Sequence, residues 1–265
     1  MAIDFTLSPE LEDLRMRVRA FVDDVIKPTE AELTDPDHIE DRAEYLTKLI
    51  GMRTKAQEAG IWLPHMPEEW GGMGLGHVEL AMVQAEAAKA YYGPFVFNCM
   101  APDEGNMHTL LHWATDEQKE TYLRPLCEGI AMSCFAMTEP EVAGSDPTLI
   151  RTTAVQDGDE WVINGHKWFI SNARRAKFAI LVCRTEDNPD LPQAANTAFI
   201  VDIPSDGWNR VREVETMHGG TGHSEIVIED LRVPDANMLG GRGQGHMLGQ
   251  YRLGPARLAH CMRWI

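Results

Sequence analysis

The hydrophobic pattern of this 265-residue sequence changes its period near Ala131, and this change limits the possible folds more than any other feature. Before Ala131, apolar residues recur at spacings of three and four, as at Leu11, Leu14 and Val18, which is the pattern of amphipathic helices. After Ala131, short apolar runs alternate with turn pairs such as Asp157-Gly158, which is typical of strands. A helical block followed by a strand block predicts two domains rather than one sheet with interleaved helices.

Local signals place the boundaries of the helices in the first block. Ser8 and Pro9 are typical of the cap and first position of a helix, and Lys27-Pro28 predicts its end. Thr115 followed by Gln118 predicts a capping box. Further helices are predicted at about 41–59, stopped by Gly60, at 78–90, at 106–113 and from Thr115 to near Gly129, with a Gly/Pro loop over 64–76.

The second block predicts an antiparallel β-barrel or β-sandwich. Cys134 to Met137 is a short apolar run of the kind that ends a buried strand. Asp157-Gly158 predicts a hairpin turn, and Asn164-Gly165 predicts a second one soon after it. Strands are predicted at 152–156, 160–163, 168–170, 178–183, 198–203 and 224–231.

The sequence becomes helical again near its end. Residues 240–245 predict a glycine hinge, because no strand-to-helix unit surrounds them to support a nucleotide loop. After the hinge, Tyr251, Leu258 and Met262 form an apolar helix face. The chain is therefore predicted to be an α+β multidomain protein. Its predicted parts are an all-α domain at 1–131, a β domain at 132–243 and the first helix of a further helical domain at 244–265.

Composition excludes several classes of partner. The net charge of −17, from 41 acidic and 24 basic residues, disfavours binding to nucleic acid or to anionic lipid. No apolar run is long enough to predict a membrane span. The 5 cysteines are scattered without metal spacing, so no metal site is predicted and reduced thiols in a cytoplasmic protein are expected.

The stretch Phe-Ala-Met-Thr-Glu-Pro-Glu-Val-Ala-Gly-Ser-Asp, from Phe135 to Asp146, is the candidate ligand loop. Its apolar start leads into turn residues whose hydroxyls and amides can contact a polar ligand edge. A flat ring such as a flavin needs an apolar face and donors at its edge, which Trp168 to Ser171 and Thr138 can supply. Spacing alone favours the simpler interpretation, in which Trp168 and Phe169 are sheet core and Thr138 is a turn residue.

The same loop resembles the Thr-Glu-Pro-x-Ala-Gly-Ser-Asp signature of the acyl-CoA dehydrogenases, a family of FAD enzymes. The loop has one residue more than the common signature, at Glu141-Val142, and in this it is most similar to family members ten and eleven and their bacterial relatives. Four further motifs occur in the family's order, at Pro67-Glu68-Glu69-Trp70-Gly71-Gly72-Met73-Gly74, at Glu117-Gln118-Lys119 through Tyr122-Leu123, at Asn164-Gly165-His166-Lys167-Trp168-Phe169-Ile170-Ser171-Asn172 and at Arg232-Val233-Pro234.

The resemblance implies a role for particular residues. Those implied to line FAD are Phe135, Ala136, Met137, Thr138 and Ser145, together with Phe169, Ile170 and Ser171 at the flavin ring and its N5 edge. Ser145 and Arg257 are implied to lie near bound acyl-CoA. The catalytic base of the family is a carboxylate in a C-terminal helical domain, so no catalytic residue is expected before Ile265, and this sequence is expected to represent the first two domains and the opening helix of the third.

The implied activity is α,β-dehydrogenation of an acyl-CoA thioester in fatty acid metabolism, with hydride transfer to flavin N5. The implied partners are acyl-CoA, electron-transfer flavoprotein as electron acceptor, and further copies of the chain in a homodimer or tetramer. One alternative is a non-catalytic module that binds flavin or acyl-CoA. A third interpretation is a flavin monooxygenase of related fold. The Thr-Glu-Pro and Gly-Ser-Asp motifs disfavour it, because they resemble those of the dehydrogenases.

Overall fold

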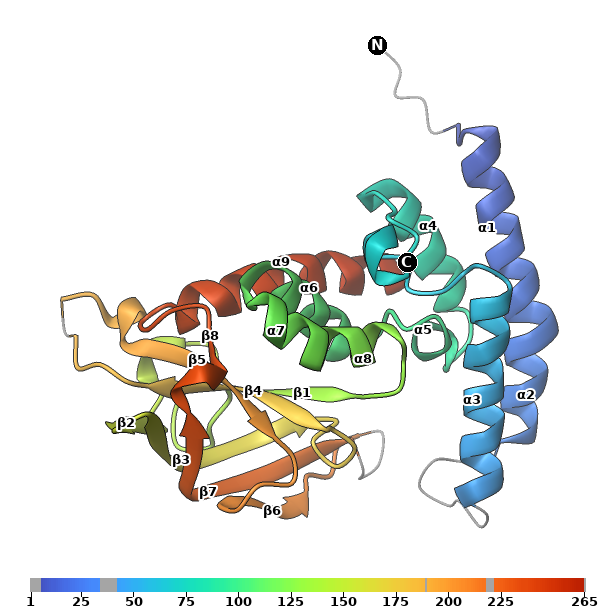
Figure 1. Cartoon of the computed structure of the whole chain (residues 1–265). Helices are drawn as coiled ribbons and strands as arrows, with labels where there is room; N and C mark the ends of the chain where they lie inside the picture. Colours follow the sequence, from blue (N-terminus) through green and yellow to red (C-terminus); the bar gives the residue numbers. More distant parts are fainter. Residues whose placement is uncertain (1–5, 34–41, 189, 218–221, 265) are drawn as a thin grey trace. The chain divides into compact units, whose positions relative to one another are not determined.

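The computed structural model describes residues 6–33, 42–188, 190–217 and 222–264. By its internal contacts the chain forms two compact units (Figure 1). The first unit contains residues 1–100 and 256–265, and the second contains residues 101–255. The predicted domain limits at 131/132 and 243/244 stay a prediction.

The first unit is helical. Apolar residues that recur with helical spacing, among them Val18, Leu49 and Val83, are buried in it. Its elements are α1 (Pro9–Phe21), the π-helical turn η1 (Val22–Ile26), α2 (Lys27–Glu32), α3 (Arg42–Glu58), the 3₁₀ turn η2 (Glu68–Trp70), α4 (His77–Ala87), α5 (Gly93–Val96) and the last turns of α9 (Gly245–Arg263).

The start of the first helix is confirmed, but its predicted end is wrong. Ser8 Oγ accepts a hydrogen bond from the amide of Leu11 at 3.2 Å, as the cap requires. The helix does not end at Lys27-Pro28 but continues to Glu32. The wide turn η1 directly before Pro28 loosens the regular ladder, so the missing amide hydrogen of proline is tolerated there.

The second unit begins with helices and continues as a sheet. The capping box is confirmed, since the Gln118 amide donates to Thr115 Oγ1 at 3.2 Å and the Thr115 amide to Gln118 Oε1 at 3.1 Å. The helical elements are α6 (Asp103–Trp113), α7 (Asp116–Gln118), the π-helical turn η3 (Lys119–Leu123) and α8 (Arg124–Cys127), followed later by the first part of α9.

The sheet has eight strands, with the order β6-β7-β3-β2-β4-β5-β8, and β1 pairs with β4. Its strands are β1 (Ser133–Ala136), β2 (Thr153–Asp157), β3 (Glu160–Ser171), β4 (Phe178–Arg184), β5 (Asn196–Asp202), β6 (Trp208–Glu213), β7 (His223–Pro234) and β8 (Met238–Leu239). Most pairs are antiparallel, whereas β1 and β2 meet β4 in parallel. The predicted order of a helical domain followed by a largely antiparallel β domain is thus confirmed.

The predicted second hairpin at Asn164-Gly165 is wrong, because β3 runs through both residues to Ser171. The register of β3 against β7 shifts between Ile163 and Gly165, so the turn signal marks a β-bulge. A side chain at Gly165 would place its Cβ 2.3 Å from Thr152 Oγ1, which explains the glycine. Asn164 bonds to Asp230 across the bulge, with its Nδ2 3.1 Å from Asp230 Oδ1.

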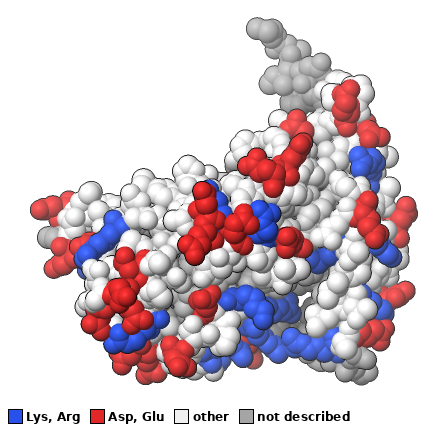
Figure 2. Space-filling model, viewed as in Figure 1, with Lys and Arg blue, Asp and Glu red and all other residues white. Residues whose placement is uncertain are grey.

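Figure 2 shows how the charged side chains are distributed over one face of the molecule. Acidic side chains are spread over the face of the molecule drawn in Figure 2, as expected for a net charge of −17. Among the described residues, no helix is long and apolar enough to cross a membrane.

Candidate functional site

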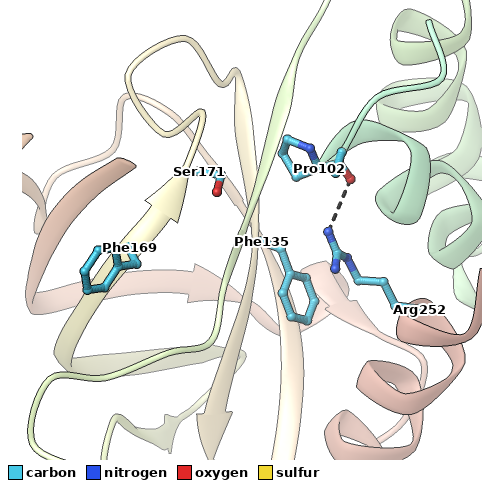
Figure 3. A pocket seen from close by; sticks show the side chains of 6 residues that line it. Pro102, Phe135, Phe169, Ser171 and Arg252 are labelled. Carbon is cyan, nitrogen blue, oxygen red and sulfur yellow. Dashed lines mark hydrogen bonds between the residues drawn. The ribbon is translucent and has the colours of Figure 1, made fainter. Parts of the chain in front are cut away.

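A pocket of about 220 Å³ lies in the second unit (Figure 3). It brings together three of the predicted flavin residues, Phe135 from β1 and Phe169 and Ser171 from the end of β3. The remaining lining residues are Ala101, Pro102 and Arg252. Two aromatic rings and a hydroxyl from different strands therefore face one cavity, an arrangement that suits a flat ligand with a polar edge.

Arg252, on α9, is the charged one of the three pocket residues that the sequence did not predict as site residues, the others being Ala101 and Pro102. Its Nε donates to Asn106 Oδ1 at 2.7 Å. Its Nη2 donates to the carbonyl of Pro102 at 3.3 Å (Figure 3). Its guanidinium carbon lies 4.2 Å from the centroid of the Phe135 ring, a cation–π contact. The resemblance implied a role for Arg257 instead, near bound acyl-CoA, and that role stays a prediction.

The charge of Arg252 is not neutralised by an ion pair with any carboxylate of the described residues. Burial lowers the pKa of Arg252 to about 10, although the charges of Asp103 and Glu104 oppose this effect. The side chain is only 9% exposed and remains a cation at neutral pH. The pocket wall therefore has a positive charge whose described hydrogen-bond partners are neutral oxygens.

Phe169 has an unusual backbone conformation. Its φ of 51° lies in the left-handed region, which is rare for an aromatic residue. The ring is 42% exposed and packs edge-on against Trp168, with ring centroids 4.8 Å apart. Two residues later, Ser171 Oγ lies 2.9 Å from His223 Nδ1 on β7. A large exposed apolar ring and an oriented hydroxyl are thus held side by side at the pocket.

The other predicted residues lie away from the pocket lining. The side chains of Ala136 and Ile170 are buried in the core of the sheet, so they can reach a ligand only through their backbone. Met137 and Thr138 are half-buried in the loop after β1, and Ser145 is exposed farther along it. Arg257 is exposed on the part of α9 that belongs to the first unit. The implied roles of these residues stay predictions.

The candidate loop is tied to the sheet through His166 on β3. His166 Nδ1 lies 2.6 Å from Glu141 Oε1, and Nε2 lies 2.8 Å from Glu225 Oε1, which belongs to β7. Burial alone would lower the pKa of His166, but the hydrogen bonds to the two carboxylates outweigh it and raise the pKa above 6.5. Glu141 lies at the extra position of the loop, so the insertion provides one half of this contact.

We expect the loop around Glu141 to loosen as the pH rises through the raised pKa of His166. A raised folded-state pKa stabilises the protonated form, so the contribution is full below the unfolded value of about 6.5 and is lost above the folded value. An NMR titration of His166 and protection factors for amides 141–146 would measure this. His166→Gln should remove the pH dependence, whereas His77→Gln, on the exposed start of α4, should keep it. A His166 pKa at or below 6.5 would contradict the expectation.

The buried thiols are not reactive groups. Four of the five cysteines are buried and all are free, and burial raises the pKa of Cys127 and of Cys183 to about 12. Such thiols are poor nucleophiles. Within the described ranges, no cluster of three or more His, Cys, Asp or Glu side chains could hold a metal ion.

Comparison with known proteins gives consistent matches. Residues 8–130 match the family model "Acyl-CoA dehydrogenase, N-terminal domain", and residues 134–231 match "Acyl-CoA dehydrogenase, middle domain". Over 266 residues the chain is 35% identical to "Probable acyl-CoA dehydrogenase FadE2" of Mycobacterium tuberculosis, a match that covers 98% of this chain and 65% of that protein.

Two further matches show how much of each relative the chain covers. It is 34% identical over 273 residues to "Acyl-CoA dehydrogenase family member 11" of Gallus gallus, covering 98% of this chain and 34% of that protein. The chain thus spans about a third of the length of that relative. The solved structure of "a putative acyl-CoA dehydrogenase from Mycobacterium abscessus" superposes with a TM-score of 0.88 at 35% identity, covering 98% of this chain and 67% of that one.

Proposed function

The chain belongs to the acyl-CoA dehydrogenase family, and we propose that it forms the flavin-binding part of an FAD-dependent dehydrogenase that acts on acyl-CoA thioesters. The observation that carries this proposal is the pocket where Phe135, Phe169 and Ser171 meet. These residues come from two separate sequence motifs. Binding of one ligand would explain why the two motifs meet in one cavity.

The pocket residues fit part of a flavin ring. The exposed face of Phe169 and the ring of Phe135 offer apolar surfaces for a flat heterocycle. Ser171, oriented by His223, offers a hydroxyl to a polar ring edge. The positive charge of Arg252 favours a ligand whose facing edge carries partial or full negative charge. A volume of about 220 Å³ holds a portion of the ring system rather than a whole dinucleotide.

FAD, when bound, supplies the acceptor for the hydride that leaves the substrate. The work of this chain is to hold that acceptor and to exclude water from it. None of the six residues that line the pocket is a carboxylate. We therefore propose that the base that removes the α proton lies outside the described residues, in the C-terminal helical domain that is characteristic of the family.

We extend the proposal to the substrate contacts and the electron acceptor that the family implies. Ser145 and Arg257 would contact the acyl-CoA, and electron-transfer flavoprotein would take up the electrons. A homodimer or tetramer in the cytoplasm is the proposed working form. The second candidate function is a module that binds flavin without dehydrogenation, and the observation that favours it is a pocket lining without a carboxylate.

The test is a titration of the purified chain with FAD, followed by visible absorbance and tryptophan fluorescence. Phe169→Ala should weaken FAD binding by about tenfold to a hundredfold, since a ring stacked on an aromatic side chain gains roughly 1–3 kcal/mol. Val155→Ala, an exposed apolar truncation on β2 of the same sheet, serves as the matched control and should leave the affinity unchanged.

Three outcomes separate the candidates. FAD binding together with dye reduction by an acyl-CoA supports the dehydrogenase. FAD binding without dye reduction by any acyl-CoA supports the binding module. No uptake of FAD by the wild-type chain, or equal affinities of Phe169→Ala and wild type, overturns the flavin assignment of this pocket.

A further inference from the structure

A buried ion pair lies directly behind the candidate loop. Lys167 Nζ, on β3, donates to Glu139 Oε1 at 2.8 Å, and the two side chains are 0% and 1% exposed. The carboxylate accepts three more hydrogen bonds, from the amides of Arg151 and Thr152 at 2.7 and 2.9 Å and from Thr152 Oγ1 at 2.6 Å. Such a fully bonded carboxylate is ionised, and it anchors the loop to the strand that starts at Thr153.

The same lysine also holds the loop backbone. Lys167 Nζ donates to the carbonyl of Met137 at 2.9 Å. The next residue, Trp168, donates its amide to the carbonyl of Thr138 at 3.0 Å. Two consecutive residues of β3 thus bind two consecutive carbonyls of the loop. Through these bonds, the segment that follows Phe135 is fixed to the segment that precedes Phe169.

The bonds to the loop coincide with a break in the sheet. After the first register shift, β3 pairs with β7 from Gly165 to Lys167, and pairing resumes only at Ile170, after a second register shift. Inside this gap the Trp168 amide bonds to the loop, and Phe169 adopts its left-handed φ of 51°. A β-bulge of this kind re-aims a side chain, and strained residues persist only where the surroundings fix them. The ring of Phe169 lines the pocket at this point.

We propose that Lys167 and Glu139 are positioning residues, which hold Thr138 against Trp168 and thereby keep the Phe169 ring in the ligand pocket. The pair does not line the pocket, and its effect on the ligand passes through the backbone of Trp168 and Phe169. The consequence for flavin binding rests on the proposed function of the pocket, whereas the hold on the Trp168 amide does not.

Removal of one partner alone cannot test this proposal, since a single buried charge would destabilise the whole unit. The test variant is the double substitution Lys167→Met with Glu139→Gln, which removes both charges and retains an acceptor for Thr152. The matched control is Arg232→Met with Asp157→Asn, an exposed ion pair at 3.0 Å in the same sheet. Glu139→Asp alone, which keeps both charges but shortens the reach of the carboxylate, is the second variant, for use where the double variant does not fold.

Two readouts are compared among wild type, test variant and control. The first is hydrogen exchange of the Trp168 amide in the flavin-free chain, with residues 160–163 of β3 as the internal reference. The second is the dissociation constant of FAD together with the visible spectrum of the bound flavin. We expect Trp168 exchange about tenfold faster and FAD binding about tenfold weaker in the test variant, with neither changed in the control.

An unchanged Trp168 exchange rate overturns the proposal. Faster exchange with unaltered FAD affinity and spectrum also overturns it, because the pair would then serve stability alone. If the wild-type chain takes up no FAD, the proposed function fails, while the exchange of the Trp168 amide still decides whether the pair holds the loop.

Discussion

Lys167→Met is expected to lower the free energy of unfolding of the second unit by about 3–5 kcal/mol, the usual effect of removing one partner from a buried ion pair. Methionine approximates the length of the lysine stem, so packing changes little. The Glu139 carboxylate, however, remains buried without a cation. Urea unfolding followed by tryptophan fluorescence, to which Trp161 in the core of this unit contributes, would measure the loss.

The control for this prediction is Arg232→Met. Arg232 contacts Asp157 and Glu160 at 3.0 Å each, but its side chain is 53% exposed. Exposed ion pairs contribute little, so a change within about 0.5 kcal/mol is expected. Equal decreases in the free energy of unfolding for the two variants would show that the buried Lys167 pair stabilises the unit no more than an exposed pair does.

The pH dependence of the Lys167→Met variant gives a second check. In the wild type, burial raises the pKa of Glu139, but the charge of Lys167 and the hydrogen bonds outweigh it, so the pKa lies below 4.5. Stability from this group is therefore present above the unfolded pKa and is lost as the pH falls through the folded one. In the variant, burial is opposed by fewer groups and raises the pKa, so the deficit relative to wild type should shrink as the solution is acidified.

Gly72→Ala is expected to destabilise the first unit by about 3 kcal/mol or more. A Cβ at this position would lie 2.0 Å from the carbonyl oxygen of Met66 and 2.8 Å from that of Leu63. Neither backbone atom can move freely, because the amides of Gly74 and Met73 donate to them. The loop must therefore deform, and the melting temperature of the unit should fall.

The matched control is Gly51→Ala. Gly51 lies in α3 of the same unit, and a Cβ there meets no atom within 4 Å. Alanine is the better helix former by about 1 kcal/mol, so this variant should be slightly more stable than wild type. Comparable melting temperatures for the two alanine variants would contradict the steric explanation of the Pro67 to Gly74 motif.

Much of the fold could be predicted because its signals are local. Ser8, Thr115 and Gly60 mark helix ends through their own side chains or backbone, so short segments of sequence are sufficient. Strand β6 was missed because it reads Trp-Asn-Arg-Val-Arg-Glu, which has a single buried residue, Trp208, and no clear alternation. Asn164-Gly165 was misassigned because Gly165 is required by its distant neighbour Thr152, which a turn signal cannot reveal.

The candidate site was only partly predictable for a similar reason. Sequence resemblance selected the two segments that meet, but within each it could not separate side chains that face the pocket from those that face the core. Phe135 and Phe169 face the pocket, whereas Ala136 and Ile170 are core residues. Arg252 reaches the pocket from a helix far along the chain, and its role depends on Asn106 and Pro102, which no local pattern connects to it.

The burial of Lys167 also has a use as a chemical reporter. Most amine-reactive reagents modify a lysine only when its side chain reaches water, and Lys167 is fully buried while Lys27 and Lys89 are about half exposed. Under native conditions, acetylation followed by peptide mass spectrometry should therefore label Lys27 and Lys89 and spare Lys167. The rate at which Lys167 becomes acetylated would therefore report how often the sheet opens locally. The acetylation rates of Lys27 and Lys89 would serve as the internal standard for the reactivity of the reagent.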